Sequence, residues 1–209
     1  MLIPYKDICN RYNIKPTGVL HIGAHWAEEA QDYYNNGVQR TVWVEADPGC
    51  ISHAINVLEP YPNHIIFNDC ISDRDNQEVV LNISNNQGQS SSLLELAHHK
   101  IAHPEVHYID TIKLRTKRVD TLFKQNKLNI SDYQFVNIDI QGNELKALKG
   151  MGELLSQVSY LYLEINELYL YTDCALVSEI DEYVAQFGFK GVETAMCGNT
   201  GWGDKLYIK

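Results

Sequence analysis

Basic residues are scarce in this sequence of 209 residues, in which 17 Lys and Arg stand against 27 Asp and Glu. The net charge of −10 disfavours nucleic acid as a partner, because proteins bind phosphates mainly through Lys and Arg. The sequence also has no apolar run long enough to span a membrane. Residues 1–7 lack the pattern of a signal peptide. We therefore expect a cytoplasmic protein that neither spans a membrane nor binds nucleic acid.

Cysteines are few, and their spacing offers neither a disulfide framework nor a redox or zinc motif. There are five of them, an odd number, and no two form a Cys-x-x-Cys pair. Free thiols of this kind are typical of a reducing compartment. We therefore expect reduced cysteines in a globular protein, for which 44% of hydrophobic residues is an ordinary content.

Histidines are concentrated in one stretch, where His99, His103 and His107 are spaced by four residues. On a helix this spacing would place the three rings on one face, as in a metal site. Pro104 would break such a helix, and no Cys or carboxylate pattern completes a ligand set. We therefore expect a solvated loop here and no bound metal ion.

A strand, a small turn and a helix are predicted in succession near the start of the chain. Residues 19–22 form a short apolar run, as in a buried strand, and Gly23 and Ala24 follow as a permissive turn. Residues 27–36 then have the pattern of a helix. The next apolar run ends in Glu45, about 20 residues on, where an acidic residue accepts hydrogen bonds from ribose hydroxyls. This succession is typical of a nucleotide-binding α/β unit.

The charges near this turn indicate which nucleotide it binds. Glu28 and Glu29 are predicted in the first turn of the helix, and no Lys or Arg lies there. A dinucleotide would place its pyrophosphate at this helix N-terminus, where the carboxylates repel it. The third glycine of the dinucleotide fingerprint is also missing. Because carboxylates suit a cationic sulfonium, we predict S-adenosylmethionine as the cofactor rather than NAD.

Strands and helices alternate along the chain, which predicts a mostly parallel sheet with helices on both faces. Residues 189–196 and 205–208 are predicted to close the sheet as an antiparallel pair, because the connection between them is short. We expect a single domain over residues 1–209. Polar residues stand at the predicted strand ends, where such sheets bind ligands: His21, Glu45, Asp69, Cys70, Asp139, Glu164 and Asn166.

The middle of the chain, at about residues 78–115, departs from this alternation and is predicted to be an insertion. Residues 78–83 and 111–114 have the pattern of strands, residues 84–92 that of a polar loop and residues 92–100 that of a short helix. Loops that a rigid sheet positions often determine specificity. We therefore expect the inserted segment to face the substrate.

Four motifs follow one another in a characteristic order. They are His-Ile-Gly-Ala-His at 21–25, Glu-Ala-Asp-Pro at 45–48, Ile-Asp-Ile-Gln-Gly-Asn-Glu-Leu at 138–145 and Gly-Trp-Gly-Asp-Lys-Leu-Tyr at 201–207. Together they resemble the FkbM-type methyltransferase family over nearly the whole chain. The resemblance implies an α/β fold of the Rossmann-like class I methyltransferase type. Such a fold has a seven-stranded, mostly parallel sheet with an antiparallel closing strand and helices on both faces.

Four positions depart from the usual motifs of this family. Its first strand usually ends Asp-Ile-Gly-Ala-Asn-x-Gly, whereas here His21 replaces the Asp, His25 the Asn and Ala27 the last Gly. In the usual Asp-x-Glu-Gly motif, Gln141 replaces the Glu. The family's Asp usually helps to hold the methionine end of the cofactor, and a histidine cannot form the same carboxylate–ammonium pair. These departures concern cofactor affinity more than the fold.

The resemblance implies S-adenosylmethionine-dependent methylation, typically of a hydroxyl oxygen, and we expect the acceptor to be a sugar, a glycan or another small molecule. Direct transfer needs the acceptor oxygen in line with the methyl group, and a general base helps if the acceptor is an alcohol. The candidate catalytic residues are Asp139, His25 and Glu164. The predicted cofactor-binding residues are His21, Gly23, Ala24, His25, Glu45, Ala46, Asp69, Cys70 and Asp139. The predicted substrate-contacting residues are Ser91, Asn166 and Trp202.

Several alternatives remain open at this point. A catalytically inactive binding module with the same fold would explain both His21 and Gln141. Asp139 with Glu164 and Asn166 could instead hold Mg²⁺ through oxygen ligands. An NAD-dependent oxidoreductase is disfavoured by the acidic turn, and a homodimer is an open alternative to a monomer.

Overall fold

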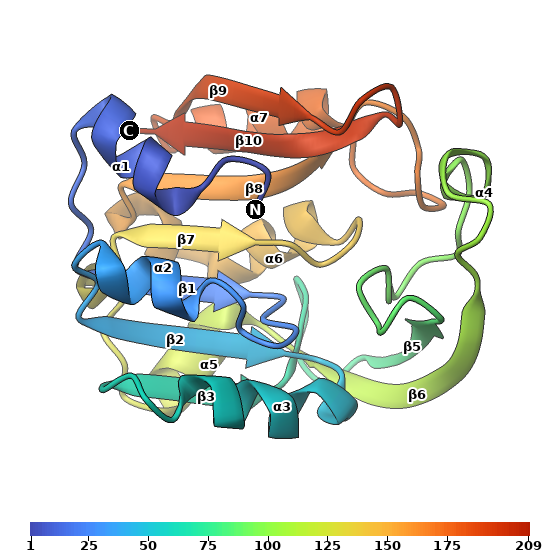
Figure 1. Ribbon diagram of the computed structural model, residues 1–209, viewed down its shortest axis with the longest axis horizontal. Helices are drawn as coiled ribbons and strands as arrows, with labels where there is room; N and C mark the ends of the chain where they lie inside the picture. Colours follow the sequence, from blue (N-terminus) through green and yellow to red (C-terminus); the bar gives the residue numbers. More distant parts are fainter.

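The computed structural model describes residues 1–209 as a central sheet between two layers of helices (Figure 1). The strands of the sheet are β1 (Gly18–Ile22), β2 (Arg40–Glu45), β3 (His64–Asn68), β7 (Phe135–Ile138), β8 (Tyr160–Asn166), β9 (Lys190–Met196) and β10 (Trp202–Ile208). Their order is β3–β2–β1–β7–β8–β10–β9. Neighbouring strands are parallel from β3 to β8, whereas β10 is antiparallel to both β8 and β9. The predicted seven-stranded sheet with an antiparallel closing strand is therefore confirmed.

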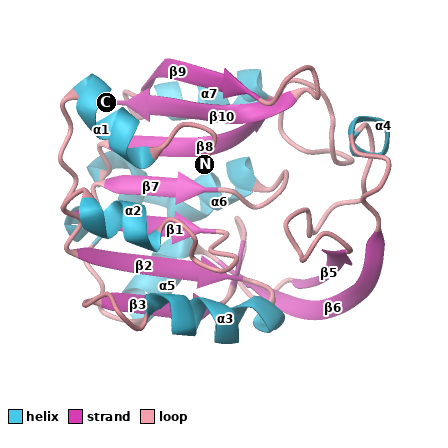
Figure 2. Ribbon diagram, viewed as in Figure 1, coloured by secondary structure: helices cyan, strands magenta, loops and turns pink.

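Helices cover both faces of the sheet, as Figure 2 shows. One layer holds α1 (Tyr5–Tyr12), α2 (Ala30–Asn35) and α3 (Pro48–Leu58). The other holds α5 (Val119–Gln125), α6 (Glu144–Met151) and α7 (Val177–Ala185), with short 3-10 turns at Ile130–Asp132 and Gly152–Gln157. None of these helices combines the length and the apolar character needed to cross a membrane.

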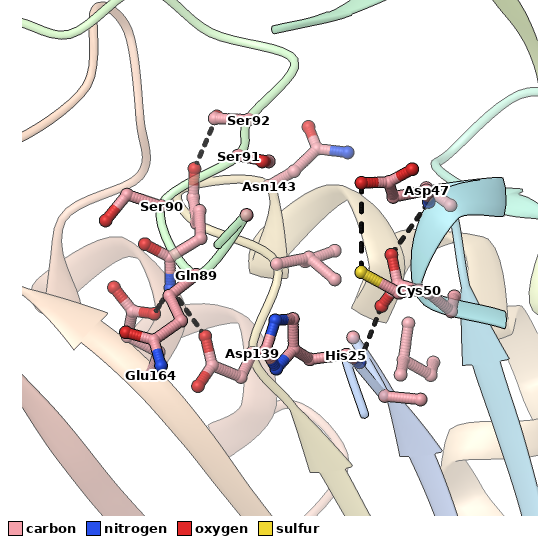
Figure 3. A pocket seen from close by; sticks show the side chains of 18 of the residues that line it. His25, Asp47, Cys50, Gln89, Ser90, Ser91, Ser92, Asp139, Asn143 and Glu164 are labelled. Atoms are coloured by element: carbon pink, nitrogen blue, oxygen red, sulfur yellow. Dashed lines mark hydrogen bonds between the residues drawn. The ribbon is translucent and has the colours of Figure 1, made fainter. Parts of the chain in front are cut away.

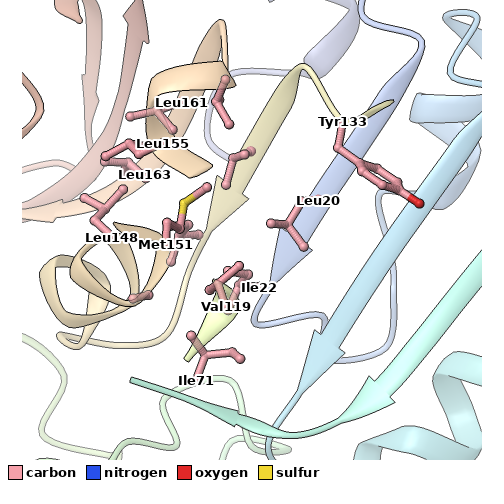
Figure 4. Close-up of a cluster of buried hydrophobic side chains, with 14 of the residues drawn as sticks. Leu20, Ile22, Ile71, Val119, Tyr133, Leu148, Met151, Leu155, Leu161 and Leu163 are labelled. Atoms are coloured by element: carbon pink, nitrogen blue, oxygen red, sulfur yellow. The ribbon is translucent and has the colours of Figure 1, made fainter. Parts of the chain in front are cut away.

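The two faces of the sheet bury separate clusters of hydrophobic side chains. Leu20 and Ile22 of β1 pack with Leu148 and Met151 of α6 in the cluster of Figure 4. Val19 points to the opposite face, because successive side chains of a strand alternate, and it packs in the cluster with α1, α2 and α3. Position 21 shares this second face. The alternation fixes which side of the sheet each strand-end residue can reach.

A second, three-stranded sheet extends beyond the carboxyl ends of the main strands (Figure 1). It consists of β4 (Cys70–Ile71), β6 (Tyr108–Lys117) and β5 (Glu78–Ser84) in that order, and the short helix α4 (His99–Ala102) lies near it. The predicted strands at 78–83 and 111–114 are confirmed, although β6 is longer than expected. The chain between them faces the carboxyl edge of the main sheet.

The predicted helix over residues 92–100 is wrong, since only the four residues of α4 are helical. The backbone before α4 pairs instead with a distant segment. Ala97 and His99 donate backbone hydrogen bonds to the carbonyl of Leu170, and Leu96 forms an isolated bridge with Tyr171. This long-range pairing gives the segment hydrogen bonds that a local helix would otherwise supply.

The helix after β1, α2, also begins later than predicted, at Ala30 rather than at residue 27. His25 and Ala27 adopt φ angles of 45° and 61°, which are left-handed and incompatible with a right-handed helix. Glu28 therefore precedes the helix and Glu29 is its N-cap, so their predicted place in the first helical turn is wrong. The position of Ala27 is one where the related family usually has glycine, which adopts such angles without strain.

Candidate functional site

A cavity of about 690 Å³ lies at the carboxyl ends of β1, β2, β7 and β8, and its outer wall comes from the segment between β5 and β6. Side chains from both halves of the molecule meet in it (Figure 3). Twelve of the residues predicted from the sequence line this cavity: His21, Gly23, Ala24, His25, Glu45, Ala46, Asp69, Cys70, Ser91, Asp139, Glu164 and Trp202.

Asn166 is the one predicted site residue that does not line the cavity. It lies at the end of β8, in register with Trp202 of β10, and it is completely buried. Neither its amide nitrogen nor its amide oxygen has a hydrogen-bond partner. The structure therefore does not bring Asn166 together with the other predicted substrate contacts.

The turn after β1 is held tightly between two neighbouring strands. The backbone N–H groups of Gly23 and Ala24 both donate to the carbonyl of Val44, at 2.9 and 3.0 Å. Gly23 has φ +89°, and a Cβ at this position would lie 1.7 Å from the backbone oxygen of Asp139. Only glycine fits there, so the turn brings the ends of β1, β2 and β7 into direct contact.

Glu45 is fixed on the cavity wall at the end of β2. Its carboxylate accepts hydrogen bonds from the backbone N–H of His25 at 2.7 Å and from that of Asp47 at 2.8 Å. Burial raises the pKa of Glu45, although these two hydrogen bonds partly oppose the shift. Asp47 in turn accepts from Gly49 and caps α3. The strand-end acid is therefore held in place by backbone groups on both sides.

His25 joins the β1 turn to the loop that covers the cavity. One ring nitrogen, Nε2, lies 2.9 Å from the carbonyl oxygen of Gln87, and Nδ1 lies 2.7 Å from a carboxylate oxygen of Glu28. Burial favours the neutral ring, but the bonds to Glu28 and Gln87 outweigh it and raise the pKa of His25. Because both ring nitrogens are engaged, His25 is poorly placed to take a proton from the hydroxyl group that is to be methylated. The geometry instead favours a role for His25 in anchoring the loop.

Half-buried Asp139 and buried Glu164 form an acid pair that a single amide bridges. Nε2 of Gln141 donates to both carboxylates, and the distance to Asp139 is 2.7 Å. The hydroxyl of Tyr171 donates to Oε1 of Gln141 at 2.5 Å. Burial, together with the neighbouring charge of Asp139, raises the pKa of Glu164 well above its ordinary value. Burial and the neighbouring charge therefore favour the protonated form of Glu164.

Glu144 supports the turn that carries Asp139 and Gln141. This side chain is completely buried, and its Oε1 accepts from the backbone N–H groups of Ile140 at 3.0 Å and Gly142 at 3.1 Å. Burial raises the pKa of Glu144 to about 7. The glutamate of the Ile-Asp-x-x-Gly-x-Glu motif thus fixes the shape of the turn and lies outside the cavity.

His21 lies in a polar cluster on the cavity floor. Its Nδ1 is 3.2 Å from the hydroxyl of Tyr33, which also accepts from the amide of Asn137, and its ring stacks on Trp43 with a centroid distance of 4.8 Å. Burial lowers the pKa of His21, so the ring is neutral near pH 7. Glu29 is the nearest carboxylate, with Oε2 at 4.0 Å from Nδ1.

The far end of the cavity is aromatic. Nε1 of Trp202 donates to Nε2 of His103 at 3.3 Å, and the rings of His99 and His103 lie 5.0 Å apart. His99 is only 5% exposed, so the expectation of a solvated loop is wrong for this residue. The pairing of 97–99 with Leu170 draws the histidines inward, a long-range effect that their spacing did not indicate. No group of three or more His, Cys, Asp or Glu has the geometry to hold a metal ion.

Sequence reasoning also missed the bridging part of Gln141 and the presence of Tyr171, which comes from a loop with no recognisable motif. A departure from the family pattern was the only signal at Gln141. The cavity is strongly acidic: no Lys or Arg side chain lines it, and the N-terminal ammonium of Met1 is paired with Glu29. Nine carboxylates line it: Glu28, Glu29, Glu45, Asp47, Asp69, Glu105, Asp139, Glu164 and Asp204.

Several solved structures with this architecture are methyltransferases. The FkbM methyltransferase of Methylobacillus flagellatus has 14% identity and a TM-score of 0.63, with 99% of this chain and 48% of that chain covered. TrmK of M. capricolum, in complex with S-adenosylhomocysteine, has 8% identity, a TM-score of 0.55 and coverages of 100% and 69%. Magnesium protoporphyrin IX methyltransferase of Synechocystis, with bound S-adenosylmethionine, has 10% identity, a TM-score of 0.52 and coverages of 97% and 74%. The fold is that of the class I methyltransferases.

Residues 19–190 match the family described as the methyltransferase FkbM domain. This span runs from β1 into β9 and contains the two strand-end acids Glu45 and Asp139. The chain therefore belongs to the FkbM methyltransferase family, as its motifs indicated. It spans about half the length of the Methylobacillus FkbM methyltransferase, and no curated protein sequence matches it.

S-adenosylmethionine is the cofactor of this family and fold, and the donor set of the cavity fits it. Glu45 offers carboxylate oxygens at the strand end where a ribose diol is bound in such folds. The lining has no cationic side chain for a pyrophosphate, whereas its carboxylates suit a sulfonium and an ammonium group. The residues present are thus compatible with S-adenosylmethionine and unsuited to a dinucleotide.

Proposed function

We propose that this protein transfers a methyl group from S-adenosylmethionine to a hydroxyl oxygen of a small uncharged acceptor, such as a sugar or the end of a glycan. The proposal rests on one observation: a single cavity holds both an acid placed to bind a ribose and a pair of acids placed to accept a proton. Glu45 lies at the end of β2, and Asp139 and Glu164 lie beyond the ends of β7 and within β8. Membership of the FkbM family supports the same reaction class.

The cofactor would occupy the side of the cavity next to β1, β2 and β4. In this proposal Glu45 accepts hydrogen bonds from the ribose hydroxyls, and the Gly23–Ala24 backbone lies close to the cofactor. Ala46, Asp69 and Cys70 line the same side and would border the adenine. In Figure 3, Cys50 and Asp47 lie on this side, whereas Asp139 and Glu164 lie on the other, with His25 between them. The methyl group would then face the acid pair.

The acceptor would lie between the acid pair and the aromatic end of the cavity. Trp202 offers a flat apolar face, and such faces stack well on sugar rings because aromatic side chains combine large contact area with a polar edge. Ser91, on the loop opposite, offers a hydroxyl. The absence of Lys and Arg from the lining supports an uncharged acceptor and argues against nucleic acid.

S-adenosylmethionine supplies a methyl carbon that is already electrophilic. The protein must therefore hold the acceptor oxygen in line and receive its proton. We assign the second task to the Asp139–Glu164 pair, which Gln141 holds in one arrangement. With the cofactor bound as methyl donor and S-adenosylhomocysteine as its product, this pair would accept the proton that the acceptor hydroxyl loses.

A catalytically inactive binding module is the second candidate, and His21 is the observation that favours it. A neutral ring stands where the family usually has a carboxylate, which removes one cofactor contact. Such a module would bind the cofactor weakly and transfer nothing, whereas the retained Glu45 and the acid pair have no evident use in it.

The two candidates are separated by a transfer assay. Purified protein is incubated with S-adenosylmethionine and a panel of uncharged sugars, and both S-adenosylhomocysteine and methylated sugar are measured by mass spectrometry. The proposal expects both products with at least one sugar, and expects Asp139→Asn to reduce the rate by about 10²-fold or more, the usual contribution of a general base. Binding of S-adenosylhomocysteine without any transfer would favour the inactive module.

A further inference from the structure

His21 leaves the methionine end of the cofactor without its usual charged partner. The ring is 3% exposed, and it is neutral because burial lowers its pKa. A neutral imidazole can exchange one hydrogen bond with an ammonium group but supplies no negative charge. If the cofactor is bound with useful affinity, another carboxylate must lie within reach of the same place.

Glu29 is the carboxylate nearest to His21, and one of its oxygens is free. Oε2 of Glu29 lies 4.0 Å from Nδ1 of His21 and accepts no hydrogen bond within the protein. Oε1 forms an ion pair with the N-terminal ammonium group of Met1 at 3.3 Å, so Oε2 is the oxygen left for a ligand. The side chain lines the cavity and is 22% exposed, so a ligand in the cavity can reach it.

Two other carboxylates at this end of the cavity, Glu28 and Asp204, accept hydrogen bonds from protein groups. Glu28 contacts the ring of His25 at 2.7 Å and the backbone N–H of Trp26 at 3.2 Å. Oδ2 of Asp204 accepts from the backbone N–H of Leu2 and the hydroxyl of Tyr162, each at 2.6 Å. Glu29 is therefore the acid that combines an uncommitted oxygen with the shortest distance to the His21 ring.

We propose that Glu29 replaces the missing strand-end acid and binds the α-ammonium group of the methionine portion of S-adenosylmethionine. The negative charge has thus moved from the end of β1 to the residue that caps α2. A hydrogen bond between two charged groups is roughly twice as strong as one between neutral groups, so this contact distinguishes ligands that carry the ammonium from those that lack it. The inference rests on the proposed function, because it assumes that the cofactor occupies the cavity.

The test compares two ligands on two variants by calorimetry. S-adenosylhomocysteine carries the amino-acid end, and 5′-methylthioadenosine keeps the adenosine and sulfur but lacks that end. Glu29→Gln preserves the size of the side chain and removes its charge, and Glu29 makes no side-chain capping bond that the change would break. Glu28→Gln is the matched control, because it removes the adjacent charge that is already paired with His25.

We expect Glu29→Gln to weaken the binding of S-adenosylhomocysteine roughly tenfold, because one charge-assisted contact is lost. The affinity for 5′-methylthioadenosine should change by less than about twofold. Glu28→Gln should leave the ratio of the two affinities unchanged. An unchanged ratio in Glu29→Gln, with wild-type protein binding both ligands, overturns this assignment and leaves the proposed function standing. If the wild-type protein binds neither ligand, both fail. Wild-type protein must also prefer S-adenosylhomocysteine to 5′-methylthioadenosine, a requirement that needs no variant to fold.

Discussion

Among single residues, Glu45 makes the most direct test of the cofactor site. Its two carboxylate oxygens already accept backbone hydrogen bonds, and each oxygen has a further lone pair for a ribose hydroxyl. A hydrogen bond to a charged group contributes about 1.5–3 kcal/mol. We therefore expect Glu45→Ala to lower the affinity for S-adenosylhomocysteine at least tenfold, as measured by calorimetry. Glu59→Ala, at an exposed site beyond α3, should leave the affinity unchanged. Equal affinities for wild type and Glu45→Ala would contradict the assignment.

His25 provides a prediction about pH. Despite its burial, contacts with Glu28 and the Gln87 carbonyl raise its pKa in the folded protein above the ordinary value of 6.5. A group with a raised folded pKa contributes stability that is fully present below 6.5 and is lost as the pH rises through the folded value. The free energy of unfolding of wild type should thus exceed that of His25→Gln by more at pH 5.5 than at pH 8.5, as urea titrations would show. A difference that does not change with pH would show that the ring is not charged in the fold.

The contacts of His25 also bear on catalysis. Because Nε2 and Nδ1 are both engaged, the general base is better sought in the Asp139–Glu164 pair. Sequence position alone left these three residues equivalent, since all lie at or just beyond the ends of predicted strands. Hydrogen-bond partners, which come from distant loops, distinguish them.

At the scale of elements, the turn after β1 depends on one glycine. Gly23 and Gly37 both have φ +89°, but a Cβ on Gly23 would lie 1.7 Å from the Asp139 backbone oxygen, whereas one on Gly37 meets nothing within 4 Å. Gly37→Ala should therefore lower the free energy of unfolding by roughly 1–2 kcal/mol, the cost of a left-handed backbone for a residue with a Cβ. Gly23→Ala should cost roughly 3 kcal/mol or more, because a strand end must also move. Urea denaturation of the two variants measures both values, and equal losses would rule out the close contact.

The strands were the most predictable elements, because their evidence is local. Apolar runs marked β1, β2 and β7, and the short final connection indicated the antiparallel closing pair. Helix boundaries were less predictable where a long-range contact prevailed. Residues 92–100 have a helical composition, yet their backbone pairs with Leu170 and Tyr171, which lie more than 70 positions away in the sequence.

The candidate site was predictable in position but only partly in its contacts. Residues at strand ends must converge at one edge of a parallel sheet, so Glu45, Asp69 and Asp139 were found from order alone. His99 and Tyr171 come from segments whose place depends on tertiary pairing, which no local pattern indicates. The free oxygen of Glu29 is likewise visible only once its neighbours are known.

At the scale of the whole molecule, the two sheets enclose a cavity whose charge is strongly negative. The inserted segment contributes Glu105 and the loop at 86–93, and the main sheet contributes most of the acids. Lys117 is close by, but it lies outside the cavity lining and pairs with Asp69 at 2.7 Å. The net charge of −10 adds to this field at long range. Such a cavity favours a cation and repels a phosphorylated ligand.

This field predicts which nucleotide stabilises the protein. Ligand that binds only the folded state raises the melting temperature by mass action, by an amount that grows with its concentration relative to its dissociation constant. S-adenosylhomocysteine carries no net charge and an ammonium group for Glu29, whereas NAD carries a pyrophosphate for which no Lys or Arg is present. We expect S-adenosylhomocysteine to raise the melting temperature at concentrations where NAD leaves it unchanged, in melts at low ionic strength. A shift with NAD and none with S-adenosylhomocysteine would reverse the order of ligands and assign the cavity to a dinucleotide.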